Sequence, residues 1–404
     1  MTKNEIRDVN LLDPALYRSG MPYELYDEVR AGGSVRWHPK TYVPSLDADI
    51  AFWAVLGHRE VQQANRDWET FSVFDGPMIV PFEEERRGVM LLSKEGPEHS
   101  RMRRLISDGF TPRMIAQLED KIRVRTERVL DDAAALCDLD FVADIAYLIP
   151  MHVIADIVGI PEDDRPEVFR LTDALLRSMD PLHDIPVDER LQIEMDIYNC
   201  ARELNAAKRA NPADDVWSIL ATGELDDLEL DLFFLILTIA GSETTRNALA
   251  QGLMALLAHP DQLEQLRHDP ALLPTAAEEI LRWSSPAMSS GRTATRDTEL
   301  GGQQLRAGDR VGLFYPSANR DANAFVDPYR FDITRSPNPH VAFSGGGPHY
   351  CLGASLARTE IQVMMGELLR RFETIEITGD PVWLSPGPAI SVGVAVQSLP
   401  VRLA

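Results

Sequence analysis

The sequence predicts a mainly α-helical fold with a minor β region, an α+β protein. Apolar residues recur with helical spacing through 97–284 and again through 352–372. Short aromatic, β-branched or glycine-punctuated runs, which are typical of strands, occur near 34–56, 298–315 and 374–404. No Gly/Ser-rich or Pro-rich linker divides the chain, so we expect one domain spanning 1–404.

The N-terminal part combines strands with short helices. We expect a helix at Tyr23–Ala31, strands at Ser34–Trp37 and Ala51–Val55, and a second helix that begins at Gly57. The next section, Phe71–Leu92, mixes Gly, Pro, Met and Phe without periodicity. A long irregular stretch of this kind forms either a lid or binding loop, or a plain surface loop, and both alternatives stay open.

Helices dominate the middle of the chain. They are predicted at Glu98–Ser107, Met114–Leu136, Ala143–Val158, Asp163–Met179, Val187–Ala210, Leu228–Ala258 and Pro274–Trp283. After Pro286 the pattern changes to short strands at Thr298–Leu305 and Arg310–Tyr315 and a mostly irregular stretch over 316–350. A helix is predicted again at Leu352–Phe372.

Composition and charge exclude several classes of protein. The chain has 63 acidic and 40 basic side chains and a net charge of −23, which argues against general nucleic-acid binding. The first eight residues lack the apolar core of a signal peptide, and the most apolar run, Leu232–Ala240, is too short to span a bilayer. We therefore expect a cytoplasmic protein without a membrane anchor, and a monomer.

The loop Phe343–Gly353 is the first candidate site. Its three consecutive glycines allow a close backbone approach to a flat, bulky group, and Cys351 stands just ahead of a predicted helix, where positive potential favours a thiolate. A lone thiolate on such a loop suits an axial bond to a haem iron. The alternative is a glycine-rich turn with a structural cysteine. Cys137 and Cys200 have no metal-ligand spacing and are interpreted as packing residues.

The second candidate, Ala240–Thr245, lies within the long apolar helix. A carboxylate beside a hydroxyl, Glu243 and Thr244, is unfavourable there unless it is used or paired. Gly241 and a hydroxyl that captures a backbone carbonyl can open the helix locally. The opening would admit a small molecule, to which the pair could relay protons. The alternative is a helix kink with an ion-paired glutamate.

Two further groups of charged residues stand at helical spacing. Glu279 and Arg282 are three apart on a helix with apolar flanks, which suggests a buried ion pair rather than an exposed one. His99 and Arg103 are four apart and could jointly hold an anion such as a carboxylate. The nearby Arg101, Arg104 and Arg113 form either a cationic surface or an ordinary solvated face.

Taken in order, these motifs resemble those of the bacterial cytochromes P-450, which are haem-thiolate monooxygenases. The resemblance covers almost the whole chain and is carried by His99-x-x-x-Arg103, Ala240-Gly-x-Glu-Thr-Thr245, Glu279-x-x-Arg282, Asn319-Arg320-Asp321, Pro328-Tyr-Arg-Phe331 and the cysteine loop. It implies the fold of that family, with a haem b (iron protoporphyrin IX) held between the long central helix and the helix of the cysteine loop.

The resemblance also implies roles for single residues. Cys351 resembles the axial ligand of the haem iron, and Glu243 and Thr244 match the acid–alcohol pair that serves oxygen activation. Glu279 and Arg282, with the Arg330 region, match a structural lock near the haem. Positions that usually bind the haem propionates are His99, Arg103, Arg292 and His349.

The cysteine loop departs from the usual pattern at one point. Phe343 lies eight residues before Cys351 instead of seven, and Pro348 stands between them. Similar extended loops occur in family members that oxidise sterol side chains, branched lipids and terpenoids. The extra residue could change how the aromatic ring shields the sulfur, and with it the hydrogen bonds that tune the iron.

The resemblance implies that a C–H bond of an organic substrate, O2 and two electrons yield an alcohol and water. The electrons would come from a separate ferredoxin, of the 2Fe-2S type, because the chain shows no flavin or iron–sulfur region; it could dock near Arg101, Arg104 and Arg113. Three alternatives stay open: other haem-thiolate chemistry such as that of a peroxygenase, a non-catalytic haem sensor or carrier, and a helical scaffold without cofactor.

The substrate pocket is expected to take residues from several segments. Besides the Phe71–Met90 loop, the candidates are Ile236, Ala240, Ala287, Met288, Ser289 and Val392, and Ser290 at the end of the same run. These residues are apolar or small, and no Arg or Lys stands out among them as a carboxylate anchor. The sequence therefore favours a hydrophobic substrate, terpenoid, steroid or lipid-like.

Overall fold

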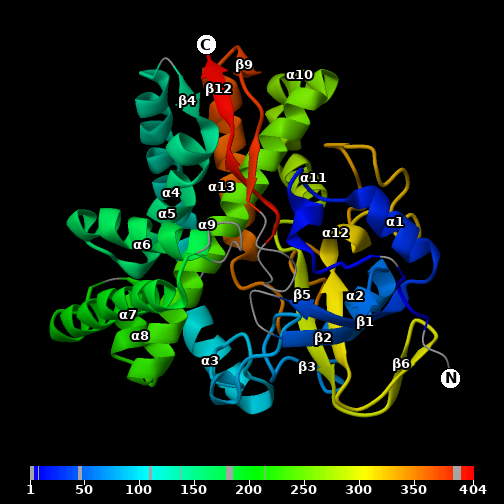
Figure 1. Cartoon of the computed structure of the whole chain (residues 1–404). Helices are drawn as coiled ribbons and strands as arrows, with labels where there is room; N and C mark the ends of the chain where they lie inside the picture. Colours follow the sequence, from blue (N-terminus) through cyan, green and yellow to red (C-terminus); the bar gives the residue numbers. More distant parts are fainter. Residues whose placement is uncertain are drawn as a thin grey trace.

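The computed structural model describes residues 4–7, 9–43, 48–108, 112–136, 138–178, 185–213, 215–384 and 393–404. Helices gather on one side of the molecule and the largest sheet lies on the other, close to α1 and α2 (Figure 1). The C-terminal strands lie at the top of this view, beside α13. The mainly α fold with strands from both ends of the chain is thus confirmed.

The longest helix is α9 (Asp227–Ala258), which begins with a capping box formed by Asp226 and Glu229. The other helices are α1 (Tyr23–Ala31), α2 (His58–Arg66), α3 (Gly96–Asp108), α4 (Pro112–Ala134), α5 (Leu148–Val158), α6 (Arg165–Ser178), α7 (Val187–Ala210), α8 (Val216–Ala221), α10 (Pro260–His268), α11 (Leu273–Ser284), α12 (Tyr315–Ala318) and α13 (Ala354–Arg371). A π-helix, Phe141–Ala146, precedes α5, and short 3-10 turns lie at Pro14–Tyr17, Glu84–Arg86, Glu162–Asp164 and Pro270–Leu272.

The main sheet has the strand order β1-β2-β8-β5-β3. Its strands are β1 (Val35–Val43), β2 (Ala48–Val55), β3 (Phe71–Ser72), β5 (Ser289–Ala294) and β8 (Arg310–Phe314). Only the β2–β8 pair is parallel among these neighbours. The smaller sheets combine β4 (Leu139–Asp140), β12 (Pro400–Leu403) and β9 (Ile375–Ile377); β10 (Val382–Leu384) and β11 (Ala395–Ser398); and β6 (Thr298–Leu300) and β7 (Gln303–Leu305).

Several predicted bounds agree closely with the structure. The helices Tyr23–Ala31 and Val187–Ala210 are found with the predicted bounds, and the prediction for the long central helix differs by one residue at its start. Elements that escaped prediction include α8, α10 and the strand β5. The β5 sequence, SSGRTA, lacks the apolar alternation of a half-exposed strand because five of its six residues are buried.

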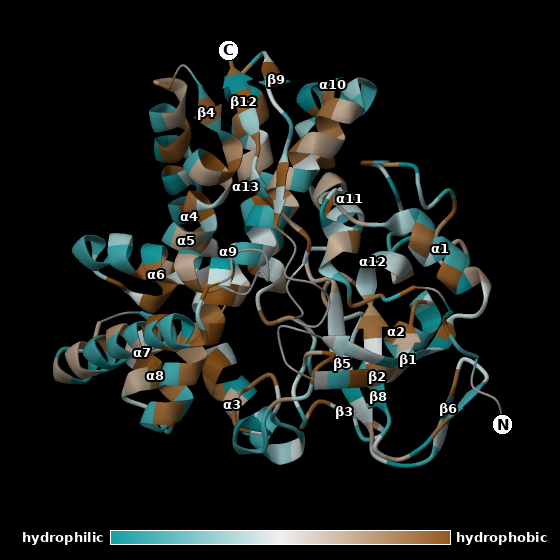
Figure 2. Cartoon of the chain, viewed as in Figure 1, coloured by the Kyte–Doolittle hydropathy of each residue, from teal (hydrophilic) through white to brown (hydrophobic). Residues whose placement is uncertain are grey.

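Helix α9 passes through the middle of the helical part and contacts α5, α7, α11 and α13. The largest apolar cluster takes residues from α4, the π-helix, α9, α11, α13 and the C-terminal strands. On α7, by contrast, hydrophilic residues cover much of the outer surface (Figure 2). Among the described residues, one helical stretch, Phe141–Val158, is apolar and long enough to cross a membrane, but 67% of it is buried inside the fold, as expected of a core helix.

Candidate functional site

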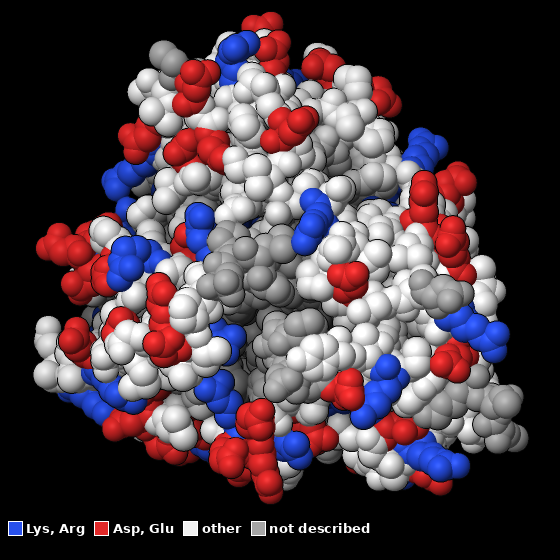
Figure 3. All heavy atoms as spheres, in the orientation of Figure 1, with Lys and Arg blue, Asp and Glu red and all other residues white. Residues whose placement is uncertain are grey.

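One face of α9 is accessible in the middle of an otherwise buried helix. Ile236, Ala240 and Thr244 succeed one another at intervals of four residues; Ala240 is exposed and the other two are half-buried. On another side of the helix, a Cβ added at Gly241 would come within 2.6 Å of Ile154 Cδ1, so the glycine allows α5 to pack closely. The accessible face is the apolar wall expected of a pocket, and the molecule is hollowed at the centre of the face drawn in Figure 3.

The hydroxyl of Thr244 donates a hydrogen bond of 2.8 Å to the carbonyl of Ala240, as the sequence suggested. Helix α9 nevertheless continues without a break to Ala258. The helix is therefore not opened here: the Thr244 hydroxyl only adds a hydrogen bond to the Ala240 carbonyl. Gly241 allows the close packing of α5 instead.

Glu243 and Thr244 point to different partners. Glu243 is 2% exposed and forms an ion pair with Arg246, whose guanidinium also lies 3.8 Å from Asp173 on α6. Among the described residues no hydrogen bond joins Glu243 to Thr244. The alternative of an ion-paired glutamate is thus realised, and any proton relay through Glu243 requires that this pair loosen.

Cationic and imidazole side chains converge beside the cysteine loop. The ring centroids of His99 and His349 lie 4.3 Å apart, and Arg103 Nη2 donates to the carbonyl of Tyr350 at 2.7 Å. Arg292 is buried and donates to Asn65 Oδ1 at 2.6 Å and to the carbonyl of Gly291 at 2.7 Å. Within the described parts of the chain, neither arginine forms an ion pair with a carboxylate.

The pKa values of this group report the same crowding of positive charge. Burial, together with the nearby Arg292, His99 and Arg103, lowers the pKa of His349 to about 3. Burial and Arg103 also lower the pKa of His99. The site therefore favours an anion, because one would offset both the desolvation and the mutual repulsion.

Cys351 lies next to this group, in a loop held by backbone bonds. Its amide donates to the carbonyl of Phe343 at 3.4 Å, and positive φ angles at Ser344, Gly345, Gly346 and Gly347 turn the chain. Burial raises the pKa of the Cys351 thiol, whereas a hydrogen bond with the Gly353 backbone and the charges of Arg103 and Arg358 lower it. The charges that favour a thiolate are thus present, but the effect of burial on the pKa of the Cys351 thiol is larger.

Within the cysteine loop the Phe343 ring packs against two other side chains. Its centroid lies 6.2 Å from that of the Tyr350 ring and 4.6 Å from the Arg358 guanidinium. A second backbone approach is tight: a Cβ at Gly347 would lie 2.1 Å from the carbonyl of Asn65. Asn65 was not predicted as a site residue, but it joins Arg292 to the carbonyl of Ser344, and so links β5 to the cysteine loop.

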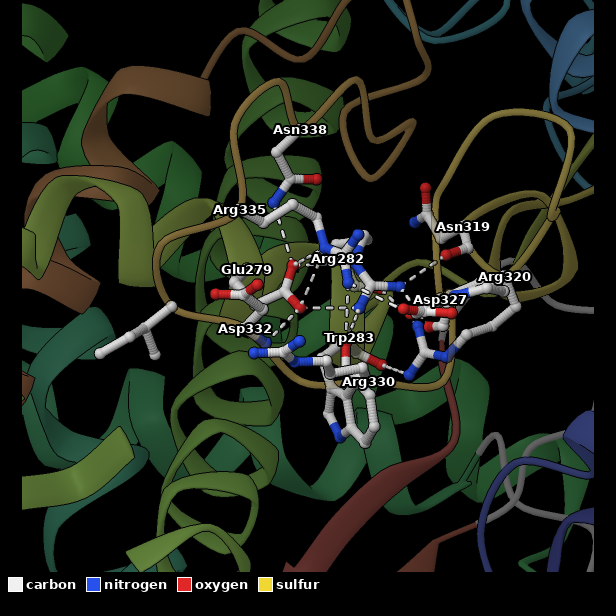
Figure 4. Close-up of polar contacts among 12 residues, drawn as sticks. Glu279, Arg282, Trp283, Asn319, Arg320, Asp327, Arg330, Asp332, Arg335 and Asn338 are labelled. Atoms are coloured by element: carbon white, nitrogen blue, oxygen red, sulfur yellow. Dashed lines mark hydrogen bonds and ion pairs between the residues drawn. The ribbon is translucent and has the colours of Figure 1, made fainter. Parts of the chain in front are cut away.

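Glu279 and Arg282 form the buried pair that the sequence predicted, and they are fully buried. Figure 4 shows the network around them: Arg282 donates to the carbonyls of Asn319, Pro328 and Arg330, and Glu279 accepts from Arg335 and Asn338. Arg330 takes part through its backbone, while its side chain is exposed. The guanidinium that meets Glu279 from this region belongs to Arg335, which sequence reasoning missed.

A haem fits these residues. Cys351 offers a sulfur for an axial bond, and the cluster of His99, Arg103, Arg292 and His349 favours anions of the kind that haem propionates supply. The described residues contain no cluster of His, Cys, Asp or Glu that could hold a metal ion directly.

The remaining pocket and docking candidates are distributed unevenly. Met288 is fully buried among core residues and Ser289 is 1% exposed, whereas Ala287 is half-buried against a core cluster; all three stay predictions as pocket residues. Val392 and the side chain of Arg113 lie outside the described residues. Arg101 is ion-paired with Glu98 and Glu229, so of the docking arginines Arg104 is the exposed one for which the structure records no partner.

A separate groove of about 490 Å3 lies between α4, the 3-10 turn before α11, and α13. Arg123, Arg267, Glu367 and Arg370 line it together with apolar side chains. None of the predicted site residues borders it.

Comparisons with known proteins agree with this geometry. A sequence profile described as Cytochrome P450 matches residues 193–403. The chain is 41% identical to the "Putative cytochrome P450 126" of Mycobacterium tuberculosis, with 93% of both chains covered, and 37% identical to a steroid C26-monooxygenase of Rhodococcus jostii, covering 93% of this chain and 81% of the relative. It is also 37% identical to a methyl-branched lipid omega-hydroxylase of Mycobacterium tuberculosis, covering 90% and 89%.

Solved structures show the same likeness. A cytochrome P450 of Mycobacterium marinum in complex with pseudoionone has a TM-score of 0.89 and 36% identity, covering 98% of this chain and 99% of that one. A cytochrome P450 of Bacillus megaterium in complex with testosterone has a TM-score of 0.80 and 29% identity, covering 95% and 99%. The chain therefore belongs to the cytochrome P450 family of monooxygenases, whose members bind haem b through a cysteine thiolate.

Proposed function

We propose that this protein inserts one oxygen atom of O2 into a C–H bond of a hydrophobic small molecule, with Cys351 as the axial ligand of the haem. The observation that carries the proposal is the position of Cys351 beside four cationic or imidazole groups without a described carboxylate partner. The bound haem supplies the activation of dioxygen and the transfer of its oxygen atom. The protein chain, acting as a single domain, supplies ligation, proton transfer and the pose of the substrate.

The roles of individual residues follow from their surroundings. His99, Arg103, Arg292 and His349 hold the propionates, because two guanidiniums and two imidazoles gather there without a described carboxylate partner. Thr244 places its hydroxyl on the accessible face of α9 and shares the carbonyl of Ala240. Its hydroxyl can both donate and accept a proton there. Glu243, which is ion-paired with Arg246, helps to deliver protons without lying on the accessible face itself.

The substrate is a terpenoid, steroid or lipid-like molecule. The accessible face of α9 presents Ile236 and Ala240, and no cation belongs to that face. The relatives named for steroid C26 and methyl-branched lipid oxidation, and the structure with pseudoionone, favour the same class of molecule.

Electrons come from a separate 2Fe-2S ferredoxin. Arg104 is exposed on α3, the helix that also carries Arg103 beside the cysteine loop, so an acidic partner docked there would approach the thiolate side of the haem. Arg101 contributes less, because Glu98 and Glu229 already neutralise it.

The experiment that tests the function combines a spectrum with turnover. The purified holoprotein should show the red-shifted Soret band in its reduced carbon monoxide complex, and sterols, branched lipids or terpenoids should shift the spin state of the ferric haem. A hit should then be hydroxylated with surrogate ferredoxin, ferredoxin reductase and NADH. A red-shifted band without turnover of any spin-shifting molecule would count against the monooxygenase proposal and for a haem sensor or carrier.

A further inference from the structure

The irregular segment between β3 and α3, for which the sequence left a lid and a surface loop both open, is bonded to β5 and β8 over residues 75–79. Most of these bonds come from Arg310 on β8, which is paired with Thr293 of β5 and is 8% exposed. Its guanidinium donates from Nε to the carbonyl of Ile79 at 3.0 Å, and from Nη2 to the carbonyl of Gly76 at 2.7 Å and to that of Met78. Three carbonyls of one short stretch, 76–79, thus bind one buried cation.

The cation is held by these neutral groups rather than by an acid. Its fourth bond runs from Nη1 to Thr293 Oγ1 at 2.8 Å, and that hydroxyl in turn donates to Asp75 Oδ2 at 2.7 Å. Asp75 itself is ion-paired with Arg87 at 3.4 Å. Among the described residues Arg310 has no carboxylate ion pair, so the backbone of 76–79 provides most of the polar surroundings that its charge requires.

The sheet is shaped to receive this stretch. The amide of Gly291 donates to the carbonyl of Pro77 at 2.6 Å, and a Cβ at Gly291 would lie only 1.8 Å from the carbonyl of Met78. Gly312, opposite Gly291 in the β5–β8 pair, likewise leaves room for Ile79, which is fully buried. Because Arg292 follows Gly291, this contact lies one residue from a predicted propionate ligand.

The rest of the segment is held differently. The amide of Phe82 donates to the carbonyl of Asp75, and that of Gly88 to the carbonyl of Phe74, so residues 82–88 are bonded back onto the segment itself. Their recorded link to another element is the partly exposed ion pair of Arg86 with Glu194 on α7, at 3.5 Å. Pairs of this kind contribute little to stability.

We propose that Arg310 is a positioning residue for the substrate: it clamps residues 76–79 on the β5–β8 pair as a fixed wall of the substrate pocket, and leaves 81–90 as the part that moves. The role in binding substrate rests on the proposed monooxygenase function, whereas the attachment of residues 76–79 by Arg310 does not. Met78 and Val80, both half-buried, are the side chains that this wall offers to a ligand. Selectivity then depends on a residue that does not touch the substrate.

The test compares holoenzyme variants. Arg310→Gln removes the clamp, Arg310→Lys keeps the charge but cannot reach three carbonyls, and Arg306→Gln, on the exposed turn that leads into β8, is the matched control. We expect Arg310→Gln to retain the red-shifted carbon monoxide band, to bind the best spin-shifting molecule about tenfold more weakly and to spread the sites of hydroxylation. Arg310→Lys should lie between it and the wild type, and Arg306→Gln should match the wild type.

Unchanged affinity and product ratios in a folded Arg310→Gln variant would overturn the proposal, as would an equal effect of Arg306→Gln. Hydrogen exchange of the wild-type holoenzyme provides a measurement that needs no variant. On ligand binding, exchange should slow in 81–90 and change little in 76–80; equal slowing of both stretches would refute the fixed wall. A red-shifted band with no turnover would contradict the proposed function only. The exchange and affinity results, by contrast, test whether Arg310 fixes residues 76–79.

Discussion

The ring centroids of His99 on α3 and His349 in the cysteine loop lie 4.3 Å apart, and burial, Arg292 and Arg103 all lower the pKa of His349. Groups that would all become cationic gather here because the fold brings together three separate segments. Such an arrangement is stable only with an anion or with neutral imidazoles. The first prediction tests which of these applies in the holoprotein.

Replacing Arg103 by Gln should weaken haem retention. A hydrogen bond to a charged partner contributes about 1.5–3 kcal/mol. Its loss should therefore make the release of haem roughly ten- to hundredfold faster. Transfer of haem to apomyoglobin measures it. Arg104→Gln is the control, since Arg104 is exposed next in sequence. Equal retention in both variants would remove Arg103 from the propionate site.

Thr244→Ala should uncouple electron use from product. The hydroxyl lies on the accessible face of α9, whereas Thr238, which makes the same kind of bond to a backbone carbonyl, is fully buried. Thr238→Ala therefore controls for the loss of an intrahelical bond. NADH consumption and product are measured together; the ratio of product to NADH should fall severalfold for Thr244→Ala alone. An unchanged ratio would refute the role of Thr244.

Breaking the buried pair should destabilise the holoprotein. Glu279→Gln leaves Arg282 and Arg335 without their carboxylate, and removal of one partner of a buried pair is destabilising by about 3–5 kcal/mol. The half-exposed pair of Arg402 and Glu376 is the reference, where Glu376→Gln should change stability by about 0–1 kcal/mol. Chemical denaturation of the holoprotein measures both. Similar small changes would mean that the network is dispensable.

Glu360 should make stability depend on pH. Burial raises its pKa to about 8 from a usual value of 4.5, although a hydrogen bond with Thr245 acts in the opposite direction. The folded protein keeps this proton where the unfolded chain has lost it, so the free energy of unfolding falls as the pH rises between these two values. Each unit of the shift corresponds to about 1.4 kcal/mol.

Glu360→Gln cannot ionise, so it should stabilise the holoprotein by several kcal/mol at about pH 8.5 and alter it little at about pH 5. Denaturation curves at the two pH values measure this difference. Glu376→Gln serves again as the control, because that side chain is half exposed. A stabilisation by Glu360→Gln that is equal at both pH values would contradict a titrating buried carboxyl.

Reversal of the exposed charge at Arg104 should slow electron delivery. Arg104→Glu places an acid where an acidic ferredoxin is proposed to dock, and the reduction rate at low salt should fall by about tenfold, less at high salt. Arg101→Glu should change it less, because Glu98 and Glu229 already engage that arginine. Stopped-flow reduction measures the rate. A rate indifferent to Arg104 and to salt would place the docking surface elsewhere.

Much of the fold was predictable from local pattern. Val187–Ala210 and Leu228–Ala258 carry long helical periodicity, and such segments can be predicted without knowing what they pack against. The strand Ser289–Ala294 could not be predicted in this way, because all but one of its residues are buried and its sequence is polar. Arg292 is bonded to Asn65 and Ser290 to Tyr315, partners distant in sequence that no local rule could have named.

The motif series from His99 through Glu243-Thr244 and Glu279-Arg282 to Cys351, by its resemblance to that of the cytochromes P-450, was enough to predict the family and with it the cofactor, because residue types and spacings can be read from the sequence alone. Only the tertiary structure decided that Glu243 pairs with Arg246, that Arg335 rather than the Arg330 side chain meets Glu279, and that Arg310 holds the segment 76–79. The physical reason is that a buried charge is defined by the groups that satisfy it, and these come from segments distant in sequence.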